Sequence, residues 1–295
     1  MRVAQKLLPT EKVCAFLDDI YLLCKPDRVR HLYDRVAHHL YENTGIRLNM
    51  GKTKVYNHGG FKPRRVEELQ PQEPNAEKVW VGDHSLPAEE QGVLVLGSPI
   101  GTQAFAEAHG QKKLNEELEL LDLLPQLPDL QCAWNLLQLC AAPRANYHLR
   151  SQPPKQVALY AATHDTAVWQ TLCYLLDRTD LCTELNRRPA YVAQLPLRLG
   201  GCGLRSACRT SPAAYWAFWA DTLPMMRARN ADLAGGFLEQ LKGEAAVVLA
   251  LAATLEAEAL VRGSGYRQCP DWDAVWNGAR PQQTTEAEPG EWRHG

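Results

Sequence analysis

The hydrophobic pattern of the chain begins with two short apolar runs. Val13–Leu17 and Ile20–Cys24 are uninterrupted apolar segments of strand length, and only Asp18 and Asp19 separate them. Such runs are typical of strands that are buried on both faces. Two residues suffice for a tight hairpin, and Asp tolerates the positive φ that these turns require. The pattern predicts a hairpin with both carboxylates at its tip; a buried helix over 13–24 is the competing interpretation.

A helical periodicity follows the predicted hairpin. Pro26 and Asp27 suit the start of a helix, and Gly45 suits its end. Between them, apolar residues recur at the i, i+3, i+4, i+7 spacing of one helix face. The members of this stripe are Val29, Leu32, Tyr33, Val36, Leu40 and Tyr41. The pattern therefore predicts one amphipathic helix over residues 27–44.

The next segment predicts short extended pieces and loops. Residues 46–57 read as extended pieces around a turn, and 59–77, rich in Pro, Gln, Glu and Arg, as a loop. Apolar stretches that end in glycine, at 78–82 and 92–101, indicate two further strands.

From Gln103 onward the pattern is helical. Leucines at helical spacing predict helices over 103–124 and 129–141, and 155–177 is a third candidate. The stretch 195–207 interrupts the helices. Its GGCG sequence indicates a turn, because it matches neither G-x-G-x-x-G nor the phosphate-binding loop with its lysine.

Helices are expected to resume at Pro212, with Ser211 as the N-cap, and to run in pieces to about Arg262. In this part, the aromatic residues between 215 and 219 favour core packing over stacking on bases. We expect little order in the polar tail. The fold class predicted is α+β, with four regions: a small antiparallel sheet plus helix over 1–101, helical regions over 102–190 and 191–262, and a poorly ordered tail over 263–295.

Composition narrows the class of protein. The chain has 295 residues with 45% hydrophobic residues, enough for one large domain or two smaller ones. Its formal net charge of -2 does not by itself indicate a nucleic-acid binder. Nine scattered cysteines without a C-x-x-C pair predict free thiols in a reducing compartment. No signal peptide or membrane-length apolar run is seen, so we expect a soluble, intracellular protein without a membrane partner.

The adjacent carboxylates Asp18 and Asp19 are the strongest chemical signal. Two like charges repel, and a divalent cation relieves this repulsion. Carboxylate oxygens suit Mg²⁺, which usually takes one or two protein carboxylates plus substrate phosphates. The functional interpretation is a metal site for phosphoryl transfer; an ordinary exposed Asp-Asp turn is the alternative.

The motifs around this pair resemble the palm of reverse transcriptases, above all those of non-LTR retrotransposons. The sequence AFLDDIYLL is followed in order by a helix, GIRLNMGKTKVYN and GVLVLGSPIG. Further downstream, 127–150 and 195–207 resemble thumb and post-thumb segments of such enzymes. The resemblance covers roughly residues 10–210.

The resemblance implies an RNA-directed DNA polymerase fold and its site residues. Asp18 and Asp19 fall on the metal-binding aspartates, which implies Mg²⁺ or Mn²⁺ as cofactor. Lys52 falls on a lysine proposed to protonate the leaving pyrophosphate. The residues matching a hairpin that grips the primer end are Leu96, Gly97, Ile100 and Gly101. An RNA template and a DNA primer are the implied partners.

One part of the family's site has no counterpart in the sequence. The family uses a third carboxylate from an upstream strand, and Glu11 is the sole acidic residue before Asp18. Two carboxylates from one turn poorly offset the repulsion between two Mg²⁺ ions. We therefore expect a truncated fragment that is inactive alone, begun near its Asp-Asp motif and lacking an N-terminal half. The open, apolar edge of the hairpin predicts poor solubility of the isolated N-terminal third.

Nucleic-acid contacts are expected from cations in the helical region, chiefly Lys112, Lys113, Arg144 and Arg150. The further candidates are Arg187, Arg188, Arg205 and Arg209. Scattered solvated charge is the alternative. The leading function is thus a retroelement-derived reverse-transcriptase-like protein. The second is a non-enzymatic helical module that binds RNA or protein.

Overall fold

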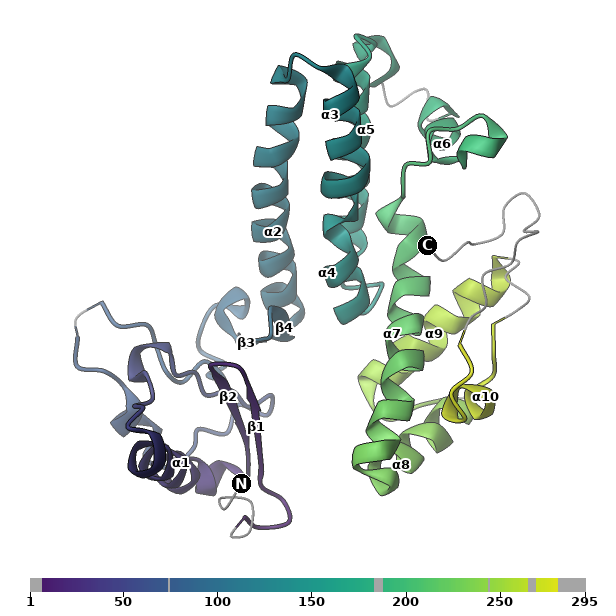
Figure 1. Cartoon of the computed structure of the whole chain (residues 1–295). Coiled ribbons are helices and arrows are strands. Elements are labelled where there is room, and N and C mark those ends of the chain that lie inside the picture. The colour runs from purple at the N-terminus through teal and green to yellow at the C-terminus, as the bar shows by residue number, and fades with distance from the viewer. Residues whose placement is uncertain (1–6, 74, 183–187, 244, 265–268, 281–295) are drawn as a thin grey trace. The chain divides into compact units, whose positions relative to one another are not determined.

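The computed structural model of the chain describes residues 7–73, 75–182, 188–243, 245–264 and 269–280 (Figure 1). It is α+β, mostly helical with two small antiparallel sheets. The chain divides into two units, Met1–Ala108 and His109–Gly295. Among the described residues, no helix combines the length and apolar character needed to cross a membrane. The predicted boundary at residue 190 is not tested and stays a prediction.

The first unit opens with the predicted hairpin. Strand β1 (Lys12–Phe16) pairs antiparallel with β2 (Asp19–Leu23), so the helical alternative for this segment is wrong. Each strand lies one residue earlier than predicted, because Phe16 pairs with Asp19 and leaves Leu17 and Asp18 as the turn.

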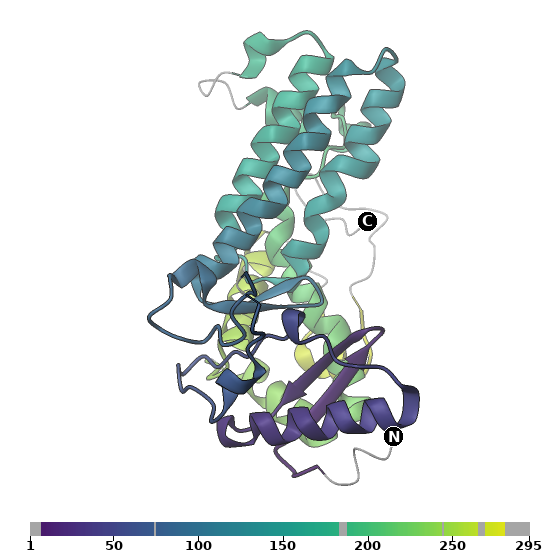
Figure 2. The same cartoon turned by 90° about the vertical axis from the view of Figure 1, so that its left-hand side faces the viewer.

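Helix α1 (Val29–Thr44) covers one face of the hairpin, and Figure 2 shows the two strands lying against it. Leu32 and Val36 are buried there against Val13 and Ile20. Gly45 ends the helix with a φ of 72° and donates its N–H to the carbonyl of Tyr41 at 2.8 Å. The predicted helix and its glycine terminus are confirmed.

The prediction that the two hairpin strands are buried on both faces is wrong for the described residues. Every residue of β1 except Val13 is exposed. Phe16 is 56% exposed and Leu17 is 89% exposed. The sheet has two strands, and among the described residues its buried contacts are with Leu32 and Val36 of α1. Apolar content alone cannot show how many layers cover a strand.

The rest of the first unit is loop-rich. The single strand predicted over 92–101 is wrong, because positive φ at Leu96 and Gly97 turns the chain back on itself. Strands β3 (Gly92–Val95) and β4 (Ser98–Gly101) instead form a second antiparallel hairpin. The strand expected at 78–82 is reduced to a single parallel bridge between Val55 and Trp80. Short 3-10 turns complete the unit: η2 (Pro26–Arg28), η3 (Met50–Lys52), η4 (Val66–Leu69) and η5 (Ala88–Glu90).

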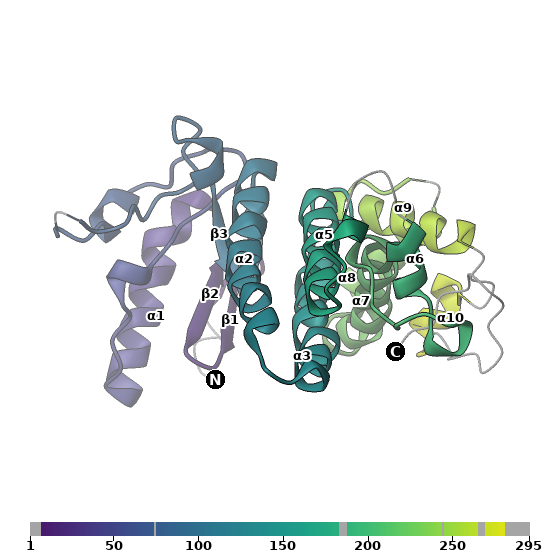
Figure 3. The same cartoon turned by 90° about the horizontal axis from the view of Figure 1, so that it is seen from above.

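The second unit is helical, and its long helices run side by side in Figure 3. Three of its segments fall where the sequence predicted helices, over 103–124, 129–141 and 155–177. The helices are α2 (Gln103–Leu123), α3 (Leu130–Leu136), α4 (Asn146–Ser151), α5 (Ala158–Leu175), α6 (Arg188–Gln194), α7 (Ala207–Arg229), α8 (Ala231–Lys242), α9 (Leu249–Gly263) and α10 (Trp272–Trp276). The shorter turns are η6 (Leu124–Gln126), a π-turn (Leu137–Ala141), η8 (Ala142–Ala145), η9 (Thr179–Cys182) and η10 (Leu197–Leu199).

Helix α7 begins at Ala207, not at Pro212 as predicted. Its N-cap is Ser206, whose hydroxyl accepts the N–H of Arg209. The carboxylate of Asp165 on α5 accepts the N–H groups of Ala207 (2.6 Å) and Cys208 (3.1 Å). A carboxylate at a helix N-terminus satisfies free N–H groups and complements the helix dipole. This long-range cap moves the helix start to five residues before Pro212.

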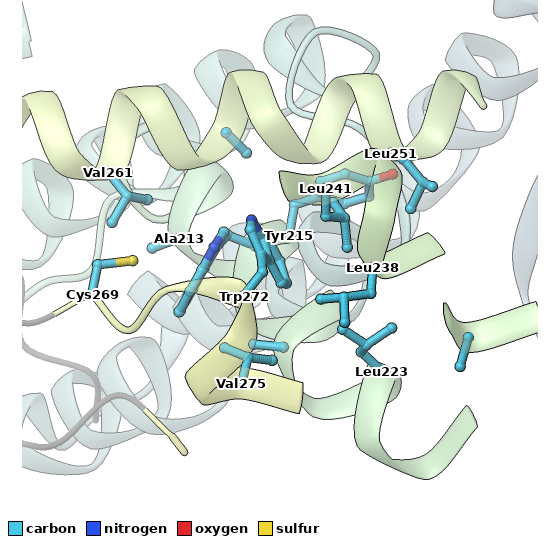
Figure 4. Packing of buried hydrophobic residues seen from close by; sticks show 14 residues of the cluster. Ala213, Tyr215, Leu223, Leu238, Leu241, Leu251, Val261, Cys269, Trp272 and Val275 are labelled. Atoms are coloured by element: carbon cyan, nitrogen blue, oxygen red, sulfur yellow. The ribbon is translucent and has the colours of Figure 1, made fainter. Parts of the chain in front are cut away.

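The largest core cluster joins α7, α8, α9 and α10 (Figure 4). Trp216 is fully buried at its centre, and its ring lies 5.9 Å from that of Trp272. The predicted core role is confirmed for Tyr215 and Trp216, which are buried, and for Trp219, which packs against the cluster, while Phe218 is half-buried outside it. Trp272 and Val275 come from the tail that we expected to lack order, so that expectation is wrong for residues 269–280, while 265–268 and 281–295 lie outside the described residues.

A polar group is buried between α2 and α5. Glu117 accepts a hydrogen bond from the hydroxyl of Tyr160 at 2.6 Å, and its second oxygen lies 2.9 Å from Nδ1 of His164. Nε2 of His164 lies 3.1 Å from the carbonyl oxygen of Ala142. Both ring nitrogens thus face acceptors, and the network satisfies polar atoms that burial would otherwise make costly.

All nine cysteines lie among the described residues, and all are free thiols, as predicted.

Candidate functional site

The β1–β2 turn carries the two predicted metal ligands. Asp18 occupies the turn and Asp19 is the first residue of β2, and both are exposed. The positive φ needed by the tight turn, 52°, falls on Leu17. The expected hairpin is present, but only one of the two aspartates lies at its tip, because pairing of Phe16 with Asp19 draws the second into the strand.

Tyr21 connects this hairpin to the second hairpin. Its hydroxyl donates to Oδ2 of Asp19 at 3.0 Å and accepts the backbone N–H of Leu96 at 3.1 Å. Burial raises the pKa of Tyr21, the Leu96 N–H opposes this rise, and the Asp19 carboxylate adds to it. The phenol therefore stays protonated and continues to donate to the carboxylate near neutral pH.

Sequence reasoning missed Tyr21, although a signal for it exists. Residues i and i+2 of a strand lie on the same face, so a strand at Ile20–Cys24 that begins beside Asp19 already places Tyr21 on the carboxylate's side. Its bond to Leu96, 75 positions later in the chain, has no local sequence signal.

The four residues predicted to grip a primer lie in the β3–β4 hairpin. Leu96 and Gly97 form its turn, with φ values of 52° and 80°. Positive φ at both central residues matches the tight hairpin turns that follow the twist of the strands. Ile100 on β4 pairs with Val93 and is 48% exposed.

Gly101 is required by close packing at the base of this hairpin. It pairs with Gly92, and a Cβ at Gly101 would collide with the carbonyl of Gln91. The ring of Phe105 lies against both glycines. The close contact with Phe105 explains why β3 begins and β4 ends with a glycine. It does not by itself assign a role to the residues of the turn.

Lys52 lies on a different element from the carboxylates. It ends the 3-10 turn η3 (Met50–Lys52), where its N–H bonds the carbonyl of Asn49 at 3.3 Å. Within the described ranges, no ion pair or side-chain hydrogen bond engages Lys52, whereas Nζ of Lys54 pairs with Glu77 at 2.7 Å. The role of Lys52 at a phosphate stays a prediction.

The donor set of the hairpin suits one divalent cation better than two. Asp18 and Asp19 supply hard oxygen ligands, and Mg²⁺ accepts one or two carboxylates with water and phosphate oxygens completing its shell. Among the described residues, no group of three or more His, Cys, Asp or Glu side chains is placed to hold a metal ion. Two carboxylates fit a weakly held single ion, and the set falls short of a two-ion centre.

The four cations expected to contact nucleic acid lie on neighbouring elements of the second unit. Leu114 on α2 packs with Ala145 of η8 and Leu149 of α4, which places Lys112 and Lys113 on one element and Arg144 and Arg150 on the adjoining ones. Lys113 is held by Glu116 at 2.7 Å, and Arg150 by Asp221 at 3.1 Å.

In the described part of the chain, Lys112 and Arg144 have no ion-pair partner and are exposed. Two of the four side chains thus lack a carboxylate partner among the described residues, and the other two are held in internal ion pairs. Arg187, a further candidate, lies outside the described residues.

Comparisons with known proteins agree with a retroelement connection. No family model matches the chain, and no solved structure matches it. Among curated proteins, the chain is similar to the Retrotransposable element SLACS 132 kDa protein of Trypanosoma brucei gambiense, with 24% identity over 238 residues. The match covers 79% of this chain and 18% of that protein, so the chain spans less than a fifth of its relative's length. This similarity supports a retroelement origin for the chain.

Proposed function

We propose that the chain is a reverse-transcriptase-type segment, with a palm remnant in the first unit and a thumb-like helical second unit. The observation that carries the proposal is the pair of hairpins joined by Tyr21. The Tyr21 hydroxyl is hydrogen-bonded both to the carboxylate of Asp19 and to the backbone N–H of Leu96. The sequence resemblance assigns these two hairpins to catalysis and to primer contact. The similarity to a retrotransposable element protein supports the same reading.

In this proposal Asp18 and Asp19 would hold Mg²⁺ or Mn²⁺, which supplies charge stabilisation for phosphoryl transfer when bound. The hydroxyl of Tyr21 orients the Asp19 carboxylate by donating to Oδ2. Lys52 would provide positive charge to a phosphate group. RNA template and DNA primer are the partners that the proposal implies.

The same residue set leads us to propose that the chain alone does not polymerise DNA. Two carboxylates leave the repulsion between two divalent ions poorly balanced. The test is a template–primer extension assay with the full chain in Mg²⁺ or Mn²⁺. We expect no Asp18-dependent incorporation, and robust incorporation that is lost in Asp18→Asn would overturn the inactivity.

Metal binding tests the site directly. Mn²⁺ titration of the full chain, followed by electron paramagnetic resonance, should show a weak site that is lost in Asp18→Asn and in Asp19→Asn. Asp27→Asn is the matched control, because Asp27 is an exposed carboxylate of the same unit outside the hairpin. Equal Mn²⁺ binding by the wild type and both hairpin variants would contradict a metal role for the pair.

A non-enzymatic helical binding module is the second candidate. The observation that favours it is the exposed, unpaired state of Lys112 and Arg144 on adjoining elements, together with the incomplete carboxylate set within the described residues. It predicts salt-sensitive RNA binding that Lys112→Ala and Arg144→Ala weaken and Asp18→Asn leaves unchanged.

A further inference from the structure

A hollow of about 330 Å³ lies on α1 and is lined by residues other than Leu32 and Val36, which pack against the sheet. Tyr33, Ala37 and Tyr41 stand one helical turn apart and form its floor, because residues four apart share a helix face. The segment after Gly45 turns back along the helix and closes the hollow with Arg47, Leu48 and Met50. All of these residues belong to the first unit.

The lining of this hollow is aromatic and apolar with one charge. The guanidinium of Arg47 lies over the ring of Tyr41, 5.0 Å from its centroid. Across the described residues, no carboxylate lies within ion-pair distance of Arg47, whereas Arg30 on α1 is held by Asp34 at 2.9 Å. Tyr41 is 46% exposed and Met50 is 39% exposed. The hollow thus offers an unpaired planar cation beside an exposed ring.

These features select a class of ligand. An apolar side chain of a peptide would be satisfied by Leu48, Met50 and Ala37, and would leave the guanidinium without a partner. A nucleotide uses both halves, because a base stacks on an aromatic ring or a guanidinium plane and its phosphate pairs with arginine. The volume lies at the lower end of ligand pockets, which suits a single base better than a larger ligand.

We propose that this hollow binds one base of a single-stranded nucleic acid. The Arg47 guanidinium, which lies over the Tyr41 ring in the free chain, turns to the adjoining phosphate and leaves the ring as the stacking platform. The site requires neither the metal at the hairpin nor polymerisation, so it goes beyond the proposed function. Tyr33 also packs against the Val66, Leu69 and Val79 cluster, which fixes the floor of the hollow.

Binding of a fluorescent ten-nucleotide oligothymidylate to the full chain, measured by anisotropy in EDTA, tests the proposal. EDTA removes any contribution of a hairpin metal. Tyr41→Ala should weaken binding about tenfold, the range measured for loss of one base–aromatic stack. Tyr41→Phe keeps the ring and should bind within about twofold of the wild type. Arg47→Ala should weaken binding about tenfold and lower the slope of log affinity against log salt by about one.

Two matched controls separate stacking from general charge. Lys25→Ala removes one exposed cation of the same unit outside the hollow and should leave the affinity within about twofold. A strand of the same length without bases keeps every phosphate and should bind about tenfold more weakly than oligothymidylate. Equal binding of the two strands, or unchanged binding by Tyr41→Ala and Arg47→Ala, would overturn the proposal.

Photocrosslinking keeps the test independent of any variant's folding. The wild-type chain is irradiated with an oligothymidylate that carries 4-thiothymidine, and adducts are mapped by mass spectrometry. Adducts at Tyr33, Tyr41 or Met50 are expected, and adducts confined to the second unit would overturn the site. Asp18→Asn should crosslink as the wild type does, which distinguishes failure of the hollow from failure of the metal site.

Discussion

The two units use apolar sequence in opposite ways. The first unit contains two uninterrupted apolar runs, at 13–17 and 20–24. Even so, Phe16, Leu17 and Leu23 in these runs are more than half exposed. In the second unit, apolar residues of the helices are buried in three clusters, the largest of which contains Trp216. A helix packs its stripe against its neighbours along the chain, whereas a strand needs partners on both of its edges and faces. The comparison teaches that burial follows the number of packing layers more closely than local hydrophobicity.

The largest expected contrast is between two aromatic truncations. Trp216→Ala should lower the free energy of unfolding of the second unit by about 4 kcal/mol, because it empties the centre of a packed cluster. Phe16→Ala, on the exposed hairpin, should change stability by less than about 0.5 kcal/mol. Urea unfolding followed by circular dichroism measures both. Similar losses for the two variants would remove the distinction between the units.

The buried polar group gives the next effect. Glu117→Gln keeps the shape but places an amide N–H₂ where two donors, Tyr160 and His164, already point. We expect a loss of about 2–3 kcal/mol, since a buried donor is left without an acceptor. Glu116→Gln is the control, because Glu116 is an exposed partner of Lys113 and should cost less than about 1 kcal/mol. Equal unfolding midpoints in urea for the two variants would contradict the role of the network.

A pH dependence follows from His148. Burial lowers the pKa of His148 to about 4, and the positive charge of His109 adds to this effect. The unfolded chain binds the proton at the ordinary pKa of about 6.5, so this contribution is fully present above pH 6.5 and is lost as the pH falls toward 4. The loss attributable to this residue is roughly 3 kcal/mol.

The measurement is the unfolding midpoint of the wild type and His148→Phe between pH 7 and pH 4, followed by tryptophan fluorescence. The ring of His148 packs edge-on against Tyr160 at 4.8 Å, a contact that Phe retains. The variant should therefore lose less stability than the wild type over this range. Parallel curves for the two proteins would show that His148 does not titrate in this window.

The smallest expected effect concerns the turn of the β1–β2 hairpin. Leu17 has a φ of 52°, a left-handed conformation that costs a non-glycine residue about 1 kcal/mol. Leu17→Gly removes that cost and should leave the hairpin as stable or up to about 1 kcal/mol more stable. Leu23→Gly, in the extended β2, should instead weaken the hairpin by about 1 kcal/mol. Hydrogen exchange of the β1 and β2 amides reports both, and changes of the same sign would contradict the assigned turn.

Local patterns were sufficient for α1, α2 and α5 and for the existence of the first hairpin. The α1 stripe and Gly45 form a local signal, and the structure places the helix within two residues of the prediction. The start of α7 could not be predicted in this way, because its cap comes from Asp165 on another helix. The packing of Trp272 is likewise a tertiary effect that outweighs the polar composition around it.

In the candidate site too, local patterns predicted the separate elements, and only the structure showed the contact between them. The Asp-Asp hairpin is encoded within a few residues, although Asp19 lies in β2 and not at the tip. The apolar pattern of 92–101 predicted one strand, and only the family resemblance implied the hairpin that β3 and β4 form. The connection of the two hairpins through Tyr21 joins positions far apart in the chain, so it required the structure. The shift of Asp19 into β2 depends on which cross-strand pair closes the turn, a choice that two apolar runs of equal length leave open.

The bridge through Tyr21 has a thermodynamic consequence. A cation that takes Oδ2 of Asp19 competes with the phenol proton for the same lone pairs, while the phenol oxygen still receives the N–H of Leu96. Ion occupancy at one loop and the position of the other loop are then linked, and the linkage is reciprocal. If a cation binds Asp19 as proposed, a contact that fixes the Leu96 backbone would change the affinity for that cation, and the cation would change the strength of that contact by the same factor.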